Sequence, residues 1–196
     1  MKKLPNSIPH SVADHYQRDA RDFARRFDFL WEELLHKNGR IKSFVDLYMG
    51  CECALKCHIF LGSLTSDPMD TYRMVRKAGH DIKKLAQLAQ MANFVEDGSI
   101  YQQLEDKLAP FSVFIRYSLD ACSIFFTSEF SSWAKYSATI GNNSWVLSVR
   151  DDLQQLMDAA GPEFSGEFVF DVGHWIKMED FLRTVAPKKY LTSKRS

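Results

Sequence analysis

The sequence lacks an excess of charge of either sign. Its 196 residues carry 25 Lys and Arg against 25 Asp and Glu, which gives a formal net charge of +0 and a pI near 7.0. Dedicated nucleic-acid binders usually carry a clear basic excess, because the neutralisation of phosphates supplies most of their non-specific affinity. The balance therefore argues against broad duplex binding and leaves room only for a small local basic patch.

Cysteine is also scarce. Cys51, Cys53 and Cys57 lie close together, and Cys122 is far away in the chain. A secreted disulfide framework would be denser and more evenly spaced, so the pattern favours a reduced, cytoplasmic protein. One face of a helix supplies only about two ligands to a metal ion, and small buried thiols are the simpler interpretation. We expect neither a metal ion nor another cofactor.

Long apolar runs and glycine-rich phosphate loops are missing as well. The most apolar stretch, residues 44–63, is interrupted by Asp46, Glu52 and Lys56, so it does not predict a membrane span. The nine glycines fall singly, without a Walker or Rossmann pattern. The basic start at Lys2 is not followed by the apolar stretch of a signal peptide.

What the chain does contain is apolar residues at helical spacing. With 45% hydrophobic and 13% aromatic residues, it has enough apolar side chains for one substantial core. Short loops and almost no strand pattern predict an all-α fold, an antiparallel up-and-down helical bundle with an irregular C-terminal tail. The spacing predicts helices at residues 10–38, 41–61, 69–77, 82–92, 145–160 and 178–185, with one long aromatic helix from Pro110 toward Trp133. A turn at residues 97–99 is followed by a short amphipathic piece to about Leu108.

The breaks between these segments predict the domain organisation. We expect residues 1–9 to be disordered, 10–160 to form the bundle, and 161–196 to be an extension that packs on it or stays partly flexible. Gly39 is expected to end the first helix, and Gly50 to let a neighbouring helix approach. Residues 167–172 form the only strand-like stretch of the chain.

Two short phrases are the most informative motifs. Glu52-Cys53-Ala54-Leu55-Lys56 lies within a predicted helix, and Gly79-His80-Asp81-Ile82-Lys83-Lys84-Leu85 opens another helix after a glycine break. Together they resemble the hallmark of HEPN domains, which are α-helical bundles found in RNA-cleaving toxins, phage-defence proteins and non-catalytic binding modules. The resemblance covers roughly residues 10–140. It implies a HEPN-like bundle that usually forms a homodimer.

The resemblance also implies a site. Lys56 would anchor an anionic group at the concave face of the bundle, and His80 lies at a helix N-terminus, where an anion is favoured. Both residues have structural alternatives, because Glu52 and Lys56 have the spacing of a surface ion pair and His80 the position of a cap. Arg116 and Tyr117 resemble the Arg-Tyr pair of the non-toxin branch of the family, with a solvated or ion-paired arginine as the alternative.

Catalytic HEPN proteins resemble one another in an arginine followed, after about four to six residues, by a histidine that moves protons at the ribose hydroxyl. Paired across a dimer, the two residues are expected to cleave RNA without a metal ion. Arg73 and His80 have this spacing, but Gly79 breaks the helix between them. At Arg116, where the motif is expected, no histidine follows within the next seven residues.

The sequence therefore leaves three hypotheses. The first is a non-catalytic module that binds a nucleotide, RNA or a protein partner such as a small nucleotidyltransferase, in a defence or toxin–antitoxin context, through Lys56, His80, Arg116 and Tyr117. The second is a metal-independent endoribonuclease that uses Arg73 and His80 across a homodimer. The third is a helical scaffold or regulator without a small ligand. In each case we expect a cytoplasmic protein without a membrane partner.

Overall fold

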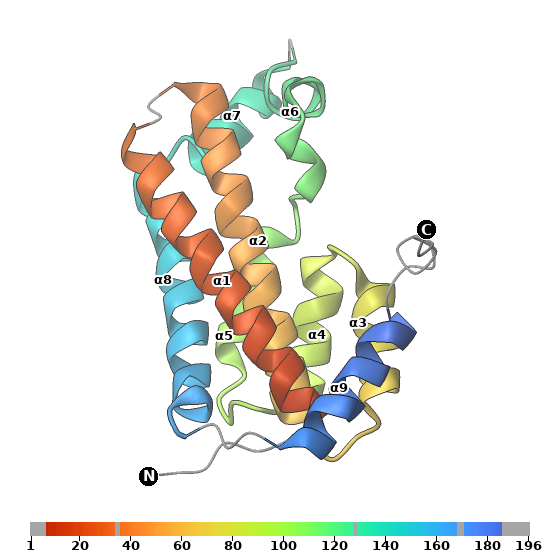
Figure 1. The fold of residues 1–196 in the computed structure, drawn as a ribbon. Helices are drawn as coiled ribbons and strands as arrows, with labels where there is room; N and C mark the ends of the chain where they lie inside the picture. The colour runs from red at the N-terminus through yellow and green to blue at the C-terminus, as the bar shows by residue number, and fades with distance from the viewer. Residues whose placement is uncertain (1–6, 34–35, 128, 168–170, 186–196) are drawn as a thin grey trace.

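The computed structural model describes residues 7–33, 36–127, 129–167 and 171–185. Over these ranges the chain forms nine α-helices and two 3₁₀ helices, so the predicted all-α helical bundle is confirmed (Figure 1). No helix within them is both long and apolar enough to pass through a membrane. The elements are α1 (Ile8–Glu33), α2 (Lys37–Gly62), α3 (Pro68–Ala78), α4 (Ile82–Ala92), α5 (Ser99–Leu108), η1 (Val113–Arg116), α6 (Ser118–Phe125), α7 (Phe130–Ala138), α8 (Asn143–Ala160), η2 (Gly161–Phe164) and α9 (Val172–Val185).

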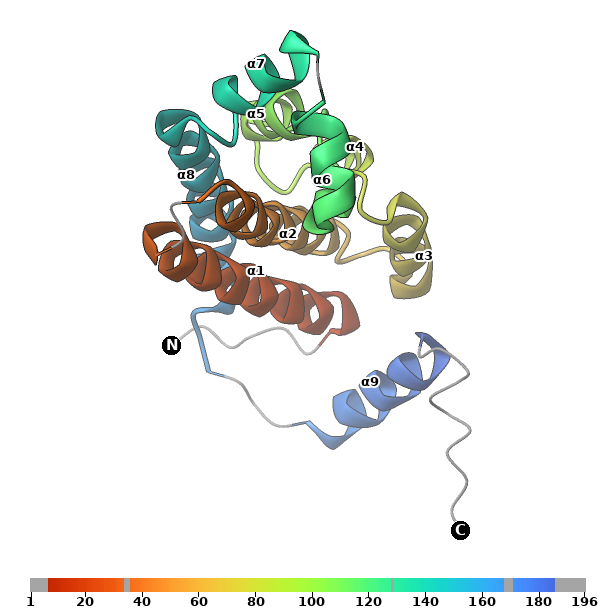
Figure 2. The same ribbon diagram turned by 90° about the horizontal axis from the view of Figure 1, so that it is seen from above.

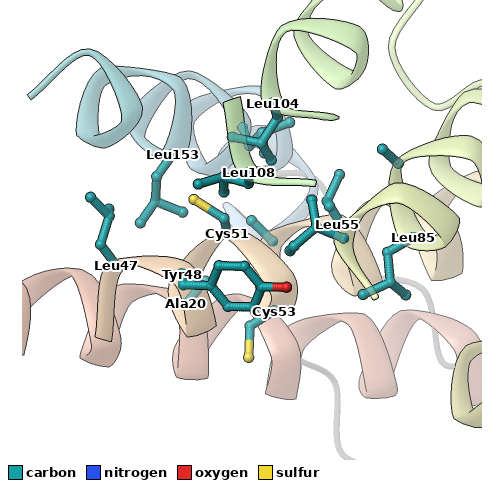
Figure 3. Packing of buried hydrophobic residues seen from close by; sticks show 14 of the residues in the cluster. Ala20, Leu47, Tyr48, Cys51, Cys53, Leu55, Leu85, Leu104, Leu108 and Leu153 are labelled. Carbon is teal, nitrogen blue, oxygen red and sulfur yellow. The ribbon is translucent and has the colours of Figure 1, made fainter. Parts of the chain in front are cut away.

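Helix α2 lies at the centre of the bundle, as its apolar residues on several faces predict. Eighteen of its 26 residues are buried, which is the pattern of a helix surrounded by others. Figures 1 and 2 show α1 along one side of α2, α8 along another and α4 and α5 beyond. Figure 3 shows the packing around it, with Leu55 among the core side chains of the neighbouring helices. Every functional side chain on α2 is therefore held by a rigid element.

Gly50 marks the closest approach of three helices, which confirms its predicted role. A Cβ atom at this position would lie 2.8 Å from Leu153 Cδ2 of α8 and 3.4 Å from Phe23 Cβ of α1. A Cβ atom here would force the Leu153 side chain to shift. The cost of a glycine inside a helix is thus offset by close packing.

The beginning of the bundle differs from the prediction at two points. Helix α1 starts at Ile8, so the predicted disordered segment 1–9 is wrong for its last residues, and residues 1–6 lie outside the described ranges. Pro9 fits there because the first turn of a helix needs no N–H from it. Gly39 lies inside the first turn of α2 and does not cap α1. Its carbonyl accepts a hydrogen bond from the Ser43 hydroxyl at 3.0 Å.

The long aromatic helix expected from Pro110 is replaced by three short elements, η1, α6 and α7. The Ser112 hydroxyl accepts the N–H of Phe114 and starts a 3₁₀ turn, and Tyr117 then adopts an extended backbone (φ −89°, ψ 128°). Local capping therefore overrides the apolar periodicity. The aromatic residues still meet, because the rings of Phe125 and Tyr136 pack edge to face at 6.0 Å.

The C-terminal extension is more regular than predicted. Helix α9 begins at Val172, where the N–H of Gly173 donates to Asp171 Oδ1 at 2.8 Å, and not near Met178. The predicted irregular tail is therefore wrong for these residues. The strand-like interpretation also fails at Val172, while residues 168–170 and 186–196 lie outside the described ranges.

Helix α9 packs against both α1 and α3. His174 Nε2 and the Ser11 hydroxyl lie 2.9 Å apart, which joins α9 to α1. On the other side, the ring of Phe181 meets Tyr72 of α3 edge to face at 5.9 Å. Figure 2 shows α9 along the outer side of α1, close to α3.

Candidate functional site

The buried Glu52 carboxylate brings the two sequence motifs together. Glu52 lies in the middle of α2 and its side chain is 1% exposed. Its Oε1 atom pairs with Lys56 Nζ one turn further along the helix. Its Oε2 atom accepts a hydrogen bond from His80 Nδ1 at 2.8 Å, across 28 residues of sequence. The acidic motif of α2 and the histidine before α4 thus form one three-residue cluster, Lys56–Glu52–His80.

A sharp turn between α3 and α4 places His80. Gly79 ends α3 with φ 63° and ψ −118°, a backbone conformation that favours glycine. Asp81, and not His80, is the N-cap of α4, because its side chain accepts the N–H of Lys84 at 3.1 Å. The carbonyl of His80 accepts the hydroxyl hydrogen of Tyr48, which lies one turn before Glu52, at 2.8 Å. The imidazole is therefore held at its backbone as well as at its ring.

The hydrogen bond to Glu52 determines which nitrogen of His80 is available. A carboxylate only accepts hydrogen bonds, so Nδ1 must donate and carry a proton. In the neutral ring the Nε2 atom then keeps a free lone pair. The His80 side chain is 55% exposed, whereas its carboxylate partner is buried. An imidazole held in this way can accept a proton from a ligand or, once protonated, bind an oxyanion.

Tyr16 of α1 forms an aromatic wall beside Lys56. The ammonium group of Lys56 lies 5.7 Å from the centre of the Tyr16 ring, which stacks on Phe60 at 6.0 Å. Burial, foremost, and the neighbouring Cys53 raise the pKa of Tyr16 to about 12, although the positive charge of Arg76 pulls it down. The phenol is therefore neutral and available as a hydrogen-bond donor.

Arg76 places a cation on this side of α3. Tyr72 and Arg76 are four residues apart and share a helical face, and both act electrostatically on Tyr16. Within the described parts of the chain, no acidic side chain forms an ion pair with Arg76. The exposed arginine thus acts on Tyr16, the ring beside Lys56.

The other predicted site residues do not contact this cluster. The guanidinium group of Arg73, one turn before Arg76 on α3, pairs with Asp70 at 2.8 Å and is 70% exposed. Arg116 donates to the Tyr117 hydroxyl at 2.8 Å and lies over the Tyr117 ring. Of the predicted site residues, Lys56 and His80 are therefore the two that meet at Glu52.

Sequence reasoning missed the link between the two motifs and the residues around it. The sequence pattern predicts Glu52 only as a partner of Lys56 and assigns no site role to Tyr16, Tyr48 or Arg76. A signal existed in α2, where Tyr48, Glu52 and Lys56 follow one another at four-residue spacing and so share a face. The approach of His80 to that face is a tertiary contact without a local sequence signal.

The cysteines and the buried His58 serve the core. Burial raises the pKa of all three thiols of α2, that of Cys53 to about 12. Figure 3 shows Cys51 and Cys53 pointing in opposite directions from α2. Burial lowers the pKa of His58 to about 4, and its ring is held by the Tyr101 hydroxyl and the Leu156 carbonyl. Among the described residues, no group of three His, Cys, Asp or Glu side chains could hold a metal ion.

Comparison with known proteins gives no relative, since no protein-family model, curated protein or solved structure matches the chain.

Proposed function

We propose that this protein is a non-catalytic, HEPN-like module that binds a phosphate-bearing ligand, a nucleotide or RNA, beside His80. The observation that carries the proposal is the buried carboxylate of Glu52, which contacts Lys56 and His80 at once. It joins the two motifs on which the HEPN resemblance rests. A buried carboxylate is costly unless it is paired, so a fold that keeps one to orient an exposed imidazole favours a functional role.

The local charge supports an anionic ligand. The whole chain is neutral, but residues 68–85 carry five Lys and Arg against two Asp. Arg76 has no acidic partner among the described residues, and the His80 side chain is 55% exposed with its Nδ1 atom on Glu52. A guanidinium group and an oriented imidazole are the donors that phosphate oxygens prefer. The neutral composition leaves room for a small basic patch, and the local charge favours α3 and the turn that follows it as its place.

Two arginines of the same helix provide a matched test. Fluorescence anisotropy with a labelled single-stranded RNA, and with a nucleoside triphosphate as competitor, would measure affinity. We expect Arg76→Ala and His80→Gln to weaken binding about tenfold or more, because each removes a charge-assisted contact. Arg73→Ala removes the same charge one turn away, where the guanidinium group is already paired with Asp70, and is expected to change affinity by about twofold or less. Equal losses in both arginine variants would contradict the proposal.

The second candidate function is a metal-independent endoribonuclease. The carboxylate–imidazole pair of Glu52 and His80 favours it, because general acid–base catalysis needs an oriented imidazole. The arginine partner predicted from the sequence, across a dimer, is Arg73. Incubation with a structured RNA in EDTA tests this candidate. Cleavage by the wild type that His80→Ala abolishes without unfolding the protein would replace the binding module with an enzyme.

The remaining proposals concern partners and location. We propose a homodimer in the cytoplasm, in a defence or toxin–antitoxin context with a small nucleotidyltransferase as a protein partner. All four cysteines are free, which supports a reducing compartment. A scaffold without a small ligand is the alternative. It predicts no thermal shift with any nucleotide, because a ligand that binds the folded state must raise its stability.

A further inference from the structure

A second surface lies between α3 and α4, and Arg76 does not line it. It is a groove of about 310 Å³ whose apolar lining comes from Met74, Ala78, Leu88 and Met91. Met74 is 45% exposed and Met91 is 80% exposed. Two methionines are thus held in water at the edge of a well-packed bundle. Exposed methionine is typical of adaptable protein-binding surfaces, because its unbranched thioether fits many shapes.

Lysines border the apolar lining. Lys77 and Lys84 belong to the same groove, one from each helix. Lys84 forms an exposed pair with Asp81 at 2.9 Å, the kind of surface contact that contributes little. No described acidic side chain pairs with Lys77. The groove is therefore apolar inside and positive along its edges.

We propose that this groove binds an acidic amphipathic helix of a partner protein. An apolar stripe on such a helix would cover Met74, Leu88 and Met91, and its Glu or Asp side chains would pair with Lys77 and Lys84. Helices α3 and α4 are 11 residues each, about 16 Å long, which matches about three turns of a docked helix. Recognition would follow the helix-in-groove mode, with apolar anchors at three- and four-residue spacing.

The lining distinguishes this partner from a nucleic acid. Single-stranded RNA needs aromatic plates on which bases stack, and the groove is lined by thioether and aliphatic groups without an aromatic ring. Its chemistry also separates it from the ligand site. Tyr72 and Arg76 lie on the α1 side of α3, whereas Met74 and Lys77 line the groove toward α4. The proposal therefore does not rest on the function of His80.

Designed peptides of about 18 residues test the groove. Three labelled peptides share leucines at helical spacing: one acidic with Glu, one basic with Lys, and one acidic with its leucines scattered around the helix. We expect the full-length protein to bind the first at least about tenfold more tightly than the other two at about 50 mM salt. Met91→Glu, at an exposed position, is expected to weaken that binding about tenfold or more, because it places a like charge on the apolar lining.

Charge variants complete the test. Lys77→Glu combined with Lys84→Glu should also lower the affinity for the acidic peptide about tenfold, while Lys42→Glu, at an exposed lysine on α2, should change it by no more than about twofold.

Failure of the acidic peptide to bind, or equal binding by Met91→Glu, would overturn the proposal. So would a wild-type dimer that Met91→Glu dissociates, since a second copy would then fill the groove. RNA binding that Met91→Glu abolishes would overturn it in favour of a nucleic acid. Arg76→Ala leaves the peptide result unchanged, which separates the two sites.

Discussion

At the scale of single residues, Glu52 is the most consequential position. An ion pair removed from water often stabilises a fold less than apolar side chains of the same volume would. Glu52 is nevertheless buried, with both carboxylate oxygens engaged by Lys56 and His80. The interaction is therefore better explained by the need to orient His80 than by stability. Removing Glu52 alone is nevertheless expected to destabilise the fold, because the charge of Lys56 is then left without its partner.

The first prediction follows from that difference. Glu52→Ala is expected to lower the free energy of unfolding by about 3 to 5 kcal/mol, because Lys56, only 13% exposed, loses its counter-charge. Asp70→Ala breaks the exposed pair with Arg73 and should cost less than about 1 kcal/mol. Urea unfolding of both variants measures the contrast. A similar, small loss in the two would show that Glu52 is not the buried charge described above.

The second prediction concerns pH and His58. Burial lowers the pKa of His58 to about 4 in the folded protein, against about 6.5 when unfolded. The unfolded chain therefore binds more protons between pH 4 and 6.5, so stability falls as the pH falls through this range, by about 3 kcal/mol in total. The stability of His58→Gln should depend less steeply on pH, because glutamine keeps polar atoms for Tyr101 and Leu156 and does not titrate. Urea unfolding of both proteins at pH 4.5 and 7.5 measures this difference. An equal loss of unfolding free energy in the wild type and in His58→Gln would contradict the prediction.

The third prediction concerns two glycines that differ in their surroundings. Gly50→Ala would place a Cβ atom 2.8 Å from Leu153, and overpacking of this kind costs about 1 to 3 kcal/mol. Gly161→Ala meets nothing within 4 Å and has a helical backbone, so it should be neutral or slightly stabilising. Thermal unfolding of the two variants would show whether α1, α2 and α8 are as tightly packed as the geometry indicates.

At the scale of elements, capping explains where sequence reasoning succeeded and where it failed. Asp67 comes directly before a proline and Asp81 follows the Gly79 break by two residues, and both side chains accept backbone N–H groups at a helix start. The segment from Pro110 failed because Ser112 starts a 3₁₀ turn within an apolar pattern that a helix shares. The missed start of α9 at Val172 has the same origin, since β-branched and aromatic residues suit both strands and helices.

The fourth prediction compares the two caps. Asp67→Ala and Asp81→Ala should each cost about 1 kcal/mol, because each frees a backbone donor at a helix start. Only Asp81 adjoins His80, so only its loss should also weaken ligand binding. Urea unfolding and RNA anisotropy on both proteins would separate the roles. Equal effects on binding would mean that the α4 turn does not position the site.

At the scale of the whole molecule, the neutral composition hides an uneven distribution of charge. The helical bundle and the central place of α2 follow from apolar periodicity, and Lys56 and His80 were selected from short motifs. The contact between them was beyond a local pattern, because Glu52 and His80 are 28 residues apart and meet only when the Gly79 turn folds back. Arg76 has no local signal for the same reason, because its electrostatic effect on Tyr16 arises only when α3 is placed beside α1.

The central claim is that Glu52 holds His80 with Nε2 free for a phosphate-bearing ligand. Nitrogen-15 NMR of the imidazole tests it directly, with the His80 signals assigned among the 6 histidines by comparison with His80→Gln. We predict a proton on Nδ1, held by Glu52, and a saturable shift of the Nε2 signal when RNA or a nucleotide is added, lost in Arg76→Ala and kept in Arg73→Ala. A bare Nδ1, or a His80 spectrum that no phosphate ligand changes, would contradict the proposed site.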